Sequence, residues 1–345
     1  MMKNNFDFKK IFIVAELSAN HNQSIDLALK TISAAKESGA DAIKIQTYTA
    51  DTLTIDCNNE YFRINNGSLW DGKTLYELYR QSYTPWEWHS KLKKHAESLD
   101  LIFFSTPFDF TAVDFLEELD VPMYKVASFE IFDIPLIKYI ASKGKPIVIS
   151  TGLAELNDIE EAVNACKDVG NNQIALLKCT SEYPAPIEEA NLLTIPDMAK
   201  RFSCIAGLSD HTTGIGVPIA AAALGAKIIE KHFILDRKLG GTDWVFSIEP
   251  SEFSQMTKLI RETEKATGKI TYVLGEKGKK NKVFARSLFV VKDIKTGEVF
   301  TKENIKSIRP GYGLHPKYYY DVLGKKSNTN IKRGTPLNWE FIENK

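Results

Sequence analysis

Eight short apolar segments rich in β-branched residues recur along the chain, and a segment with helical periodicity follows each of them. Strands that are apolar along nearly their whole length indicate a parallel sheet that is covered on both faces. Eight repeats favour closure into a (β/α)₈ TIM barrel over an open doubly wound sheet, and the turn after the first segment lacks the glycines of a nucleotide-binding sheet. We predict the strands at residues 11–16, 42–47, 102–106, 124–128, 146–151, 174–180, 204–209 and 228–233.

Two stretches depart from this repeat. Between Thr47 and Pro85 lies a long segment rich in Tyr, Trp and Asn with no clean helical pattern, which is more typical of a functional loop than of a passive connection. A Gly/Lys-rich stretch follows the helix predicted at 251–267 and is typical of a linker. We therefore predict a catalytic barrel at 1–274, a linker at 275–284 and a small, mostly β domain at 285–345.

The composition narrows the class of function. The 44 basic and 44 acidic residues cancel, so no net positive charge favours binding to nucleic acid or to an anionic membrane. The four cysteines are scattered, no signal peptide is evident, and no apolar run is long enough to span a membrane. We expect a cytoplasmic, soluble enzyme or binding protein.

Polar side chains occur at the carboxyl end of every predicted strand, which is the end where the active sites of TIM barrels lie. His211 and His232 end consecutive strands, and strand neighbours are about 4.8 Å apart, so the two imidazoles can converge on one divalent ion. Either histidine alone could instead be a hydrogen-bonded barrel residue. Glu230 lies two residues before His232 and is a candidate acid, base or anchoring group. His89 and His95 fall in the helix predicted at 85–99 and are expected at the surface.

Lysines inside strands indicate a second type of chemistry, because a buried ammonium group is costly without a partner. Lys44, Lys125 and Lys178 could each pair with a carboxylate such as Glu16 or Glu130. Together with nearby hydroxyls they could instead bind a phosphate or carboxylate group. A Schiff-base aldolase is a rival reading of the same lysines. The hydroxyls belong to Ser105, Thr106, Ser128, Ser150, Thr151 and Ser209.

A set of motifs in fixed order resembles the sialic acid synthase family over residues 11–345. The motifs are IVAELSANHNQS, AIKIQTYT, YKVASFE, VISTGLA, LKCTSEYP, GLSDHTTGIGVPIAAAALGAKIIEKHF and RPGYG. Within that family, IKIQTYTADTLT, NNGSLWDGKTLYELY and GGTDWVFSIEP are most similar to the pseudaminic acid synthases. The resemblance implies condensation of phosphoenolpyruvate with an N-acylated amino sugar, giving a nine-carbon 2-keto acid and phosphate. For the pseudaminic acid branch the sugar is 2,4-diacetamido-2,4,6-trideoxy-altrose.

The resemblance also implies roles for individual residues. His211 and His232 match the ligands of a divalent ion, typically manganese, with magnesium or cobalt as alternatives, and Glu16 and Glu230 match acidic positions of the catalytic site. Matches to the phosphoenolpyruvate-binding positions are Lys44, Thr106, Lys125, Ser150, Ser181 and Ser209, although Ser181 stands where relatives more often have Asn. Matches to sugar-side positions are Gln46, Tyr183, Asp243 and Arg309.

Arg309 belongs to a C-terminal module similar to antifreeze-like (SAF) domains, which in this family closes the barrel of the partner in a domain-swapped homodimer. Three alternative functions stay open at this point. An N-acetylneuraminate or legionaminic acid synthase would use an N-acetylmannosamine-type sugar, and the Schiff-base aldolase is a more distant rival. A non-enzymatic carbohydrate- or ice-binding protein would depend on residues 285–345 alone.

Overall fold

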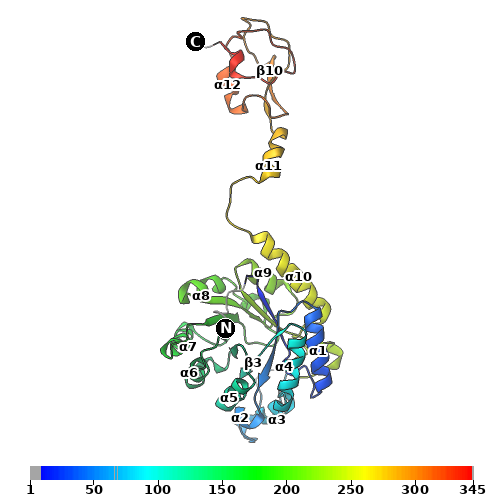
Figure 1. Cartoon of the computed structure of the whole chain (residues 1–345), viewed down its shortest axis with the longest axis vertical. Coiled ribbons are helices and arrows are strands. Elements are labelled where there is room, and N and C mark those ends of the chain that lie inside the picture. Colours follow the sequence, from blue (N-terminus) through cyan, green and yellow to red (C-terminus); the bar gives the residue numbers. More distant parts are fainter. Residues whose placement is uncertain (1–8, 66, 68, 344–345) are drawn as a thin grey trace. The chain divides into compact units, whose positions relative to one another are not determined.

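The computed structural model describes residues 9–343 apart from residues 66 and 68. The chain forms two compact units that divide between Gly268 and Lys269, and each is described by itself. The first unit is a barrel surrounded by helices, and the second is a small domain at the C-terminus (Figure 1). Within the described residues, no helix combines the length and the apolar content that crossing a membrane requires.

Eight parallel strands close into a barrel in sequence order, with β8 pairing back onto β1. This confirms the (β/α)₈ architecture predicted from the strand count. The strands are β1 (Phe12–Glu16), β2 (Ala42–Thr47), β3 (Ile102–Pro107), β4 (Tyr124–Val126), β5 (Ile147–Ser150), β6 (Ile174–Cys179), β7 (Ile205–Asp210) and β8 (Ile228–His232).

Helices surround the barrel and bury their apolar faces against the outer side of the strands (Figure 1). Helix α1 illustrates the local cause: Ser24 caps it by accepting a hydrogen bond from the Leu27 amide, and Ala28, Ile32 and Ala35 form its buried stripe. The helices are α1 (Ile25–Glu37), α4 (His89–Ser98), α5 (Phe110–Glu118), α6 (Ile134–Ser142), α7 (Leu156–Asp168), α8 (Thr194–Phe202), α9 (Gly216–Ala223) and α10 (Pro250–Thr267).

The inside of the barrel is filled by a separate apolar layer near the amino ends of the strands. Gly207 on β7 belongs to this crowded interior, because an added Cβ would lie 2.3 Å from the Ile228 carbonyl oxygen. Side chains alternate along a strand, so the next inward-facing positions lie at the carboxyl ends. The apolar layer is formed by Phe12, Val14, Ala42, Phe104, Met123, Val148, Ala175, Leu177 and Ile228.

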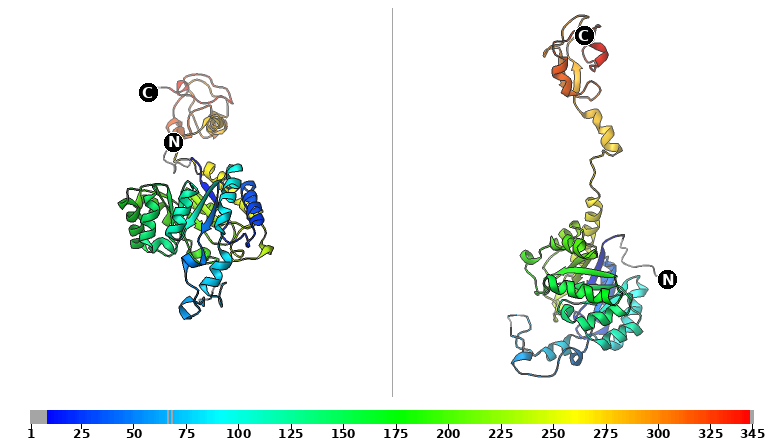
Figure 2. Two further views of the ribbon diagram at one scale, coloured as in Figure 1. Left: turned by 60° about the horizontal axis from the view of Figure 1, so that its bottom comes forward. Right: turned by 90° about the vertical axis from the view of Figure 1, so that its left-hand side faces the viewer.

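The insertion between β2 and α4 differs from the prediction, because it contains helices α2 (Ala50–Leu53) and α3 (Leu75–Ser82). A capping box starts α3: Thr74 accepts from the Glu77 amide at 3.1 Å, and Glu77 accepts from the Thr74 amide at 2.9 Å. Figure 2 shows the insertion as the light-blue segment that extends from one end of the barrel. The expectation of no clean helix in this segment was therefore wrong.

His89 is fully buried, so its expected surface position was wrong. Its Nε2 lies 2.8 Å from Thr47 Oγ1, and its Nδ1 lies 3.2 Å from the Pro85 carbonyl oxygen. Burial lowers the pKa of His89 to about 4. His95 is half-buried, with Nε2 2.8 Å from Ser33 Oγ.

The second unit contains the antiparallel pair β9 (Ser287–Val290) and β10 (Ile305–Ile308) and the short helix α12 (Tyr319–Val322). Isolated bridges link further extended segments, so the unit is mostly irregular and β in character. Helix α11 (Glu276–Asn281) occupies most of the stretch expected to be a linker. The core of the unit consists of Leu288, Val290, Ile294, Phe300, Ile305, Val322, Ile331, Leu337 and Ile342.

Candidate active site

Buried polar side chains replace the apolar layer at the carboxyl ends of the barrel strands. The residues occupy the inward-facing positions next along the strands, such as Glu16 two residues after Val14 and Lys125 two residues after Met123. Gln46 and Thr106 are register partners on β2 and β3. The structure thus brings together Glu16, Lys44, Gln46, Thr106, Lys125, Ser150, Ser209 and Glu230.

Two lysines and two carboxylates form one buried charge network. Lys44 forms an ion pair with Glu16, its register partner on β1, and lies 3.6 Å from Glu230 Oε1. The same oxygen lies 3.9 Å from Lys125 Nζ and accepts a hydrogen bond from Ser209 Oγ at 3.1 Å. Lys125 Nζ also donates to Ser150 Oγ at 2.6 Å, and Lys44 Nζ donates to Thr106 Oγ1 at 3.4 Å. The network pairs charges that would otherwise be costly to bury.

The two carboxyl groups of this network differ in protonation behaviour. Burial raises the pKa of Glu16 to about 7, against the opposing effect of Lys44. Burial would also raise the pKa of Glu230, but Lys125 and Lys44 outweigh it and hold that pKa below its ordinary value. Glu16 can therefore hold a proton near neutral pH while Glu230 stays ionised. Such divergence between neighbouring carboxyl groups is typical of acid–base sites.

His211 and His232 converge at the carboxyl ends of β7 and β8, with ring centroids 5.4 Å apart and planes at 65°. His211 Nδ1 donates to the Thr180 carbonyl oxygen at 2.9 Å, an arrangement that leaves the Nε2 lone pair available. Within the described part of the chain, buried His232 Nδ1 has no hydrogen-bond partner, and it lies 3.8 Å from Asp243 Oδ2. Burial and the positive charges nearby hold the pKa of His232 well below its ordinary value, so this ring is neutral.

These features fit a divalent cation held by the two imidazoles. Cys179 and the Thr180 carbonyl raise the pKa of His211 against the effect of its burial, so binding of a cation to this ring requires loss of its proton. A histidine anchored by a carbonyl oxygen, His211, and an unpartnered buried ring nitrogen, that of His232, are donor groups suited to such an ion. Among residues 9–343 without 66 and 68, no cluster of three or more His, Cys, Asp or Glu side chains has metal-binding geometry. His211 and His232 would hold the ion, with the other coordination positions left to water or substrate, as in open catalytic metal sites.

A group of hydroxyls surrounds Gly152, just after β5. Its amide donates to Ser128 Oγ at 3.2 Å. An added Cβ at Gly152 would lie 2.1 Å from Ser181 Oγ and 2.8 Å from Ser128 Oγ, so only glycine fits here without moving them. These hydroxyls, the Gly152 amide and the nearby Lys125–Ser150 pair offer the donors that a phosphate group requires.

Two residues that we expected among the lysines and hydroxyls inside the barrel lie on the outer face of the sheet. Lys178 alternates with inward-facing Leu177 and Cys179, so it points toward the helices, where its Nζ donates to the Cys179 carbonyl oxygen at 2.8 Å. Ser105 donates to the Ile45 carbonyl oxygen at 3.0 Å on the same outer side. The expectation of three interior lysines was wrong, and the basic group of the site consists of Lys44 and Lys125.

Two further residues lie at the site that the sequence had not marked as functional. Cys179 faces inward from β6, with Sγ 3.8 Å from His211 Nδ1. Glu130 had been considered only as a partner for a lysine. Its Oε2 is buried and has no partner among the described residues, and burial raises its pKa to about 7. Its place five residues after Lys125, just beyond the end of β4, is the signal that could have identified it.

Aromatic side chains connect the insertion to the two histidines. The Tyr183 ring lies 4.4 Å from the His211 ring and 5.0 Å from Phe246. Trp70, from the insertion, lies 5.8 Å from the Tyr183 ring and donates through Nε1 to the Thr242 carbonyl oxygen at 3.3 Å. The insertion therefore reaches back over the carboxyl end of the barrel beside the histidines.

The remaining sugar-side positions lie in different parts of the chain. Asp243 is buried in the loop after β8 and accepts from the Ala19 amide at 3.4 Å, and burial raises its pKa. Arg309 is exposed in the second unit and is described only within that unit. The barrel alone therefore supplies every expected site residue except Arg309.

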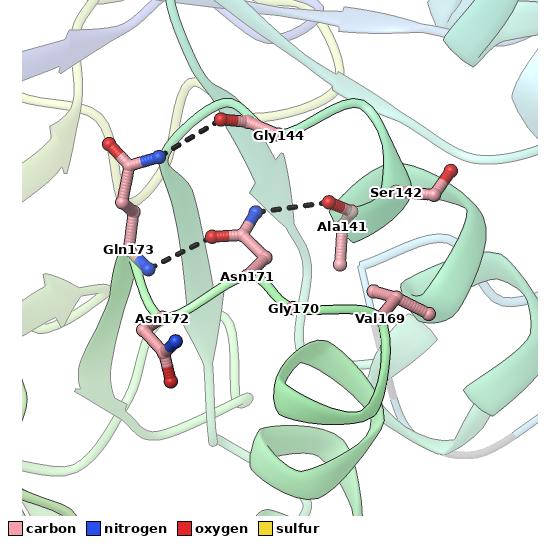
Figure 3. A pocket seen from close by; sticks show the side chains of 8 residues that line it. All are labelled: Ala141, Ser142, Gly144, Val169, Gly170, Asn171, Asn172 and Gln173. Carbon is pink, nitrogen blue, oxygen red and sulfur yellow. Dashed lines mark hydrogen bonds between the residues drawn. The ribbon is translucent and has the colours of Figure 1, made fainter.

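An open pocket of about 390 Å³ lies at the opposite end of the barrel, in the loops before β5 and β6 (Figure 3). Asn171 lines the pocket, and its side-chain amide donates to the carbonyl oxygens of Ala141 and Lys145 at 3.1 and 2.8 Å. Gln173 donates to the Gly144 carbonyl oxygen at 2.9 Å. These bonds tie the two loops together, so the polar groups of this pocket have a structural role.

Comparisons with known proteins agree on one family. Residues 31–272 match the NeuB family and residues 285–343 match the SAF domain. The chain is 48% identical to a pseudaminic acid synthase of Campylobacter jejuni over 95% of this chain and 96% of the relative. An N,N'-diacetyllegionaminic acid synthase of the same species is 38% identical over 94% of this chain and 98% of the relative. The N-acetylneuraminic acid synthetase of Leptospira borgpetersenii, solved with citrate, has a TM-score of 0.70 and 32% identity, covering 81% of this chain and 90% of that one.

Proposed function

The chain belongs to the NeuB family, and on this basis we propose that it is a pseudaminic acid synthase. It joins phosphoenolpyruvate and water to the open-chain aldehyde of 2,4-diacetamido-2,4,6-trideoxy-altrose, giving the nine-carbon 2-keto acid and phosphate. The observation that carries this proposal is the 48% identity to a pseudaminic acid synthase over nearly the whole chain. The lower identity to a legionaminic acid synthase, 38%, makes a manno-configured sugar the second candidate.

Phosphoenolpyruvate is the substrate that the basic group of the site would bind. Lys44 and Lys125 supply positive charge inside the barrel, and the hydroxyls of Thr106, Ser150 and Ser209 hydrogen-bond with the charge network. Ser181 Oγ lies against the open side of Gly152, where it would contact the phosphate together with Ser128. Donors fixed in a buried site hold an anion still without reorganisation, which favours reaction with a second bound substrate.

Glu16 is the group that we assign to proton transfer. Its pKa of about 7 allows it to carry a proton near neutral pH and to donate it to the oxygen of the aldehyde as the carbon–carbon bond forms. Glu230 stays ionised between the two lysines, where it fixes their positions and balances their charge. Glu16 and Glu230 therefore have separate roles, and the opposite directions of their pKa shifts support this assignment.

His211 and His232 would hold a divalent cation, for which we propose manganese. When bound, such an ion polarises the carbonyl oxygen of the sugar aldehyde as a Lewis acid. The chain's part is to bring both rings together at the strand ends. The Thr180 carbonyl accepts from Nδ1 of His211 and so leaves Nε2 of that ring for the ion.

The sugar would bind on the side of the histidines that the insertion covers. Tyr183 lies against His211 and Asp243 lies near His232, while Gln46 extends from β2. Trp70 closes this side through its contact with Tyr183. An apolar wall of aromatic rings suits a substrate with a methyl group and two acetamido groups, because these groups present apolar surface.

We further propose a cytoplasmic homodimer in which the SAF domain of one protomer covers the barrel of its partner and brings Arg309 to the sugar. Exposed apolar residues around the strand ends, among them Phe129, Phe132 and Ile187, support a covered rim. An Arg309→Ala variant should raise the KM for the sugar far more than the KM for phosphoenolpyruvate. Equal effects on both constants would contradict a sugar-side role.

Phosphate release measured with phosphoenolpyruvate and each candidate sugar separately tests the proposed reaction. We expect turnover with the altro-configured 6-deoxy sugar and little with N-acetylmannosamine. Preference for a manno-configured sugar would replace the proposed substrate by that of the legionaminic or sialic acid branch. Borohydride trapping of a lysine together with chelator-resistant turnover would indicate a Schiff-base aldolase instead.

A further inference from the structure

A buried ion pair behind the two histidines has no part in the reaction described so far. Asp210 and Lys231 are register partners on β7 and β8, and both are almost completely buried. They alternate with the inward-facing partners Ser209 and Glu230, so they lie on the outer, helix-covered side of the sheet. Their chain neighbours on the carboxyl side are His211 and His232.

One ammonium group contacts the chain on both sides of His211. Lys231 Nζ donates to Asp210 Oδ2 at 2.5 Å and to the Thr212 carbonyl oxygen at 2.6 Å. Asp210 Oδ1 in turn accepts from the Thr212 amide at 3.1 Å and from Thr212 Oγ1 at 2.8 Å. The Ala185 amide donates to the His211 carbonyl oxygen at 3.0 Å. Hydrogen bonds therefore hold the residue before His211, the backbone of His211 itself and the residue after it.

The same ammonium group belongs to the residue directly before His232. A shift of β8 along β7 would have to stretch or break the bonds from Lys231 to Asp210 and Thr212. Those bonds are short, shielded from water and made to a charged partner, which is the strongest class of hydrogen bond in proteins. The pair therefore adds a side-chain link between the two histidine-bearing strand ends to the backbone pairing of β7 with β8.

We propose that the Asp210–Lys231 ion pair is a positioning element that sets the separation of His211 and His232 for binding one divalent cation. This inference rests on the proposed function, because it assumes that the two histidines bind the ion. The pair lies on the far side of the sheet from the charge network and touches no proposed substrate position. A stabilising role alone does not account for its place, since buried ion pairs can be replaced by apolar residues without loss of stability.

The experiment measures manganese affinity by the EPR signal of free Mn²⁺ titrated against the full-length protein. The test variants are Lys231→Met and the double variant Asp210→Leu/Lys231→Met, whose apolar pair keeps the fold if the single variant does not. We expect the dissociation constant to rise about tenfold or more, the range typical of changes behind the direct ligands of a metal. The manganese activation curve should shift to higher concentration, while the KM for phosphoenolpyruvate at saturating manganese stays within about twofold.

Asp41→Asn is the matched control, because Asp41 forms an ion pair with Arg261 at 2.6 Å near the amino ends of the strands. It should lower the melting temperature without changing manganese affinity. A folded Lys231→Met or double variant with wild-type manganese affinity would overturn the inference while leaving the proposed reaction intact. Wild-type protein that binds no manganese would overturn both the proposed cation site and the inference.

Discussion

Replacing Gly152 with alanine should weaken the binding of phosphoenolpyruvate while leaving the barrel folded. The new Cβ would lie 2.1 Å from Ser181 Oγ and 2.8 Å from Ser128 Oγ, so both hydroxyls must rotate away. Rotation of a serine hydroxyl costs little stability, but it removes donors from the proposed phosphate position. A hydrogen bond to a charged group contributes about 1.5–3 kcal/mol. Loss of one such bond corresponds to a rise of about 10-fold to 150-fold in the KM for phosphoenolpyruvate.

Steady-state phosphate release, with each substrate varied in turn, measures this effect. The KM for the sugar should change by less than about twofold, because the sugar-side residues lie around the histidines. Gly216→Ala is the matched control: its Cβ would meet no described atom within 4 Å, and it should leave both constants unchanged. An unchanged KM for phosphoenolpyruvate in a folded Gly152→Ala variant would refute the placement of phosphate at these hydroxyls.

Three further predictions concern the cation, the sugar and acid stability. His211→Ala and His232→Ala should each abolish binding of divalent cation, measured by calorimetry, without unfolding the barrel; cation retained in both variants would contradict the assignment. Trp70→Ala should raise the KM for the sugar about tenfold by removing apolar contact. Tyr61 is an aromatic residue of the same insertion that is 81% exposed, and Tyr61→Ala should leave this KM unchanged. Equal effects of the two substitutions would rule out a specific role of Trp70 in sugar binding. Burial lowers the pKa of His89 to about 4 in the folded protein. As the pH falls below about 6.5, this histidine is therefore protonated in the unfolded chain before it is protonated in the folded one. The free energy of unfolding should therefore fall by up to about 3 kcal/mol between pH 6.5 and 4. Denaturant titrations of His89→Gln should show a smaller loss of stability over this pH range. The same loss in that variant would refute the assignment to His89.

The barrel was predictable because its strands are apolar on both faces and recur eight times. That same property concealed which face each polar residue occupies. In β6, Ala175, Leu176 and Leu177 are all buried, so no alternation distinguishes Lys178 from its neighbours. Its outward direction follows only from the register of the closed sheet. The prediction of three interior lysines failed for this reason.

Long-range contacts account for the other differences between sequence and structure. His89 lies among lysines in α4, and its burial depends on Thr47 and on the ring of Phe115, 5.2 Å away. The start of α3 carried a readable capping signal at Thr74 and Glu77, which the aromatic and Asn-rich composition around it obscured.

The convergence of His211 and His232 was predictable from strand order, because consecutive barrel strands end side by side. The ion pair of Asp210 and Lys231 was not, because sequence alone cannot separate outward-facing charges from inward-facing ones. The SDHT motif therefore contains residues that face the site, such as Ser209 and His211, and one, Asp210, that lies behind it on the outer side of the sheet.

An anomalous difference map from crystals grown with manganese chloride and phosphoenolpyruvate tests the central claim most directly. We predict one strong peak bonded to a ring nitrogen of both His211 and His232, with the phosphate near Lys125, Ser150 and the Gly152 amide. A peak at any other place in the barrel, or histidine rings turned away from each other with no peak between them, would contradict it.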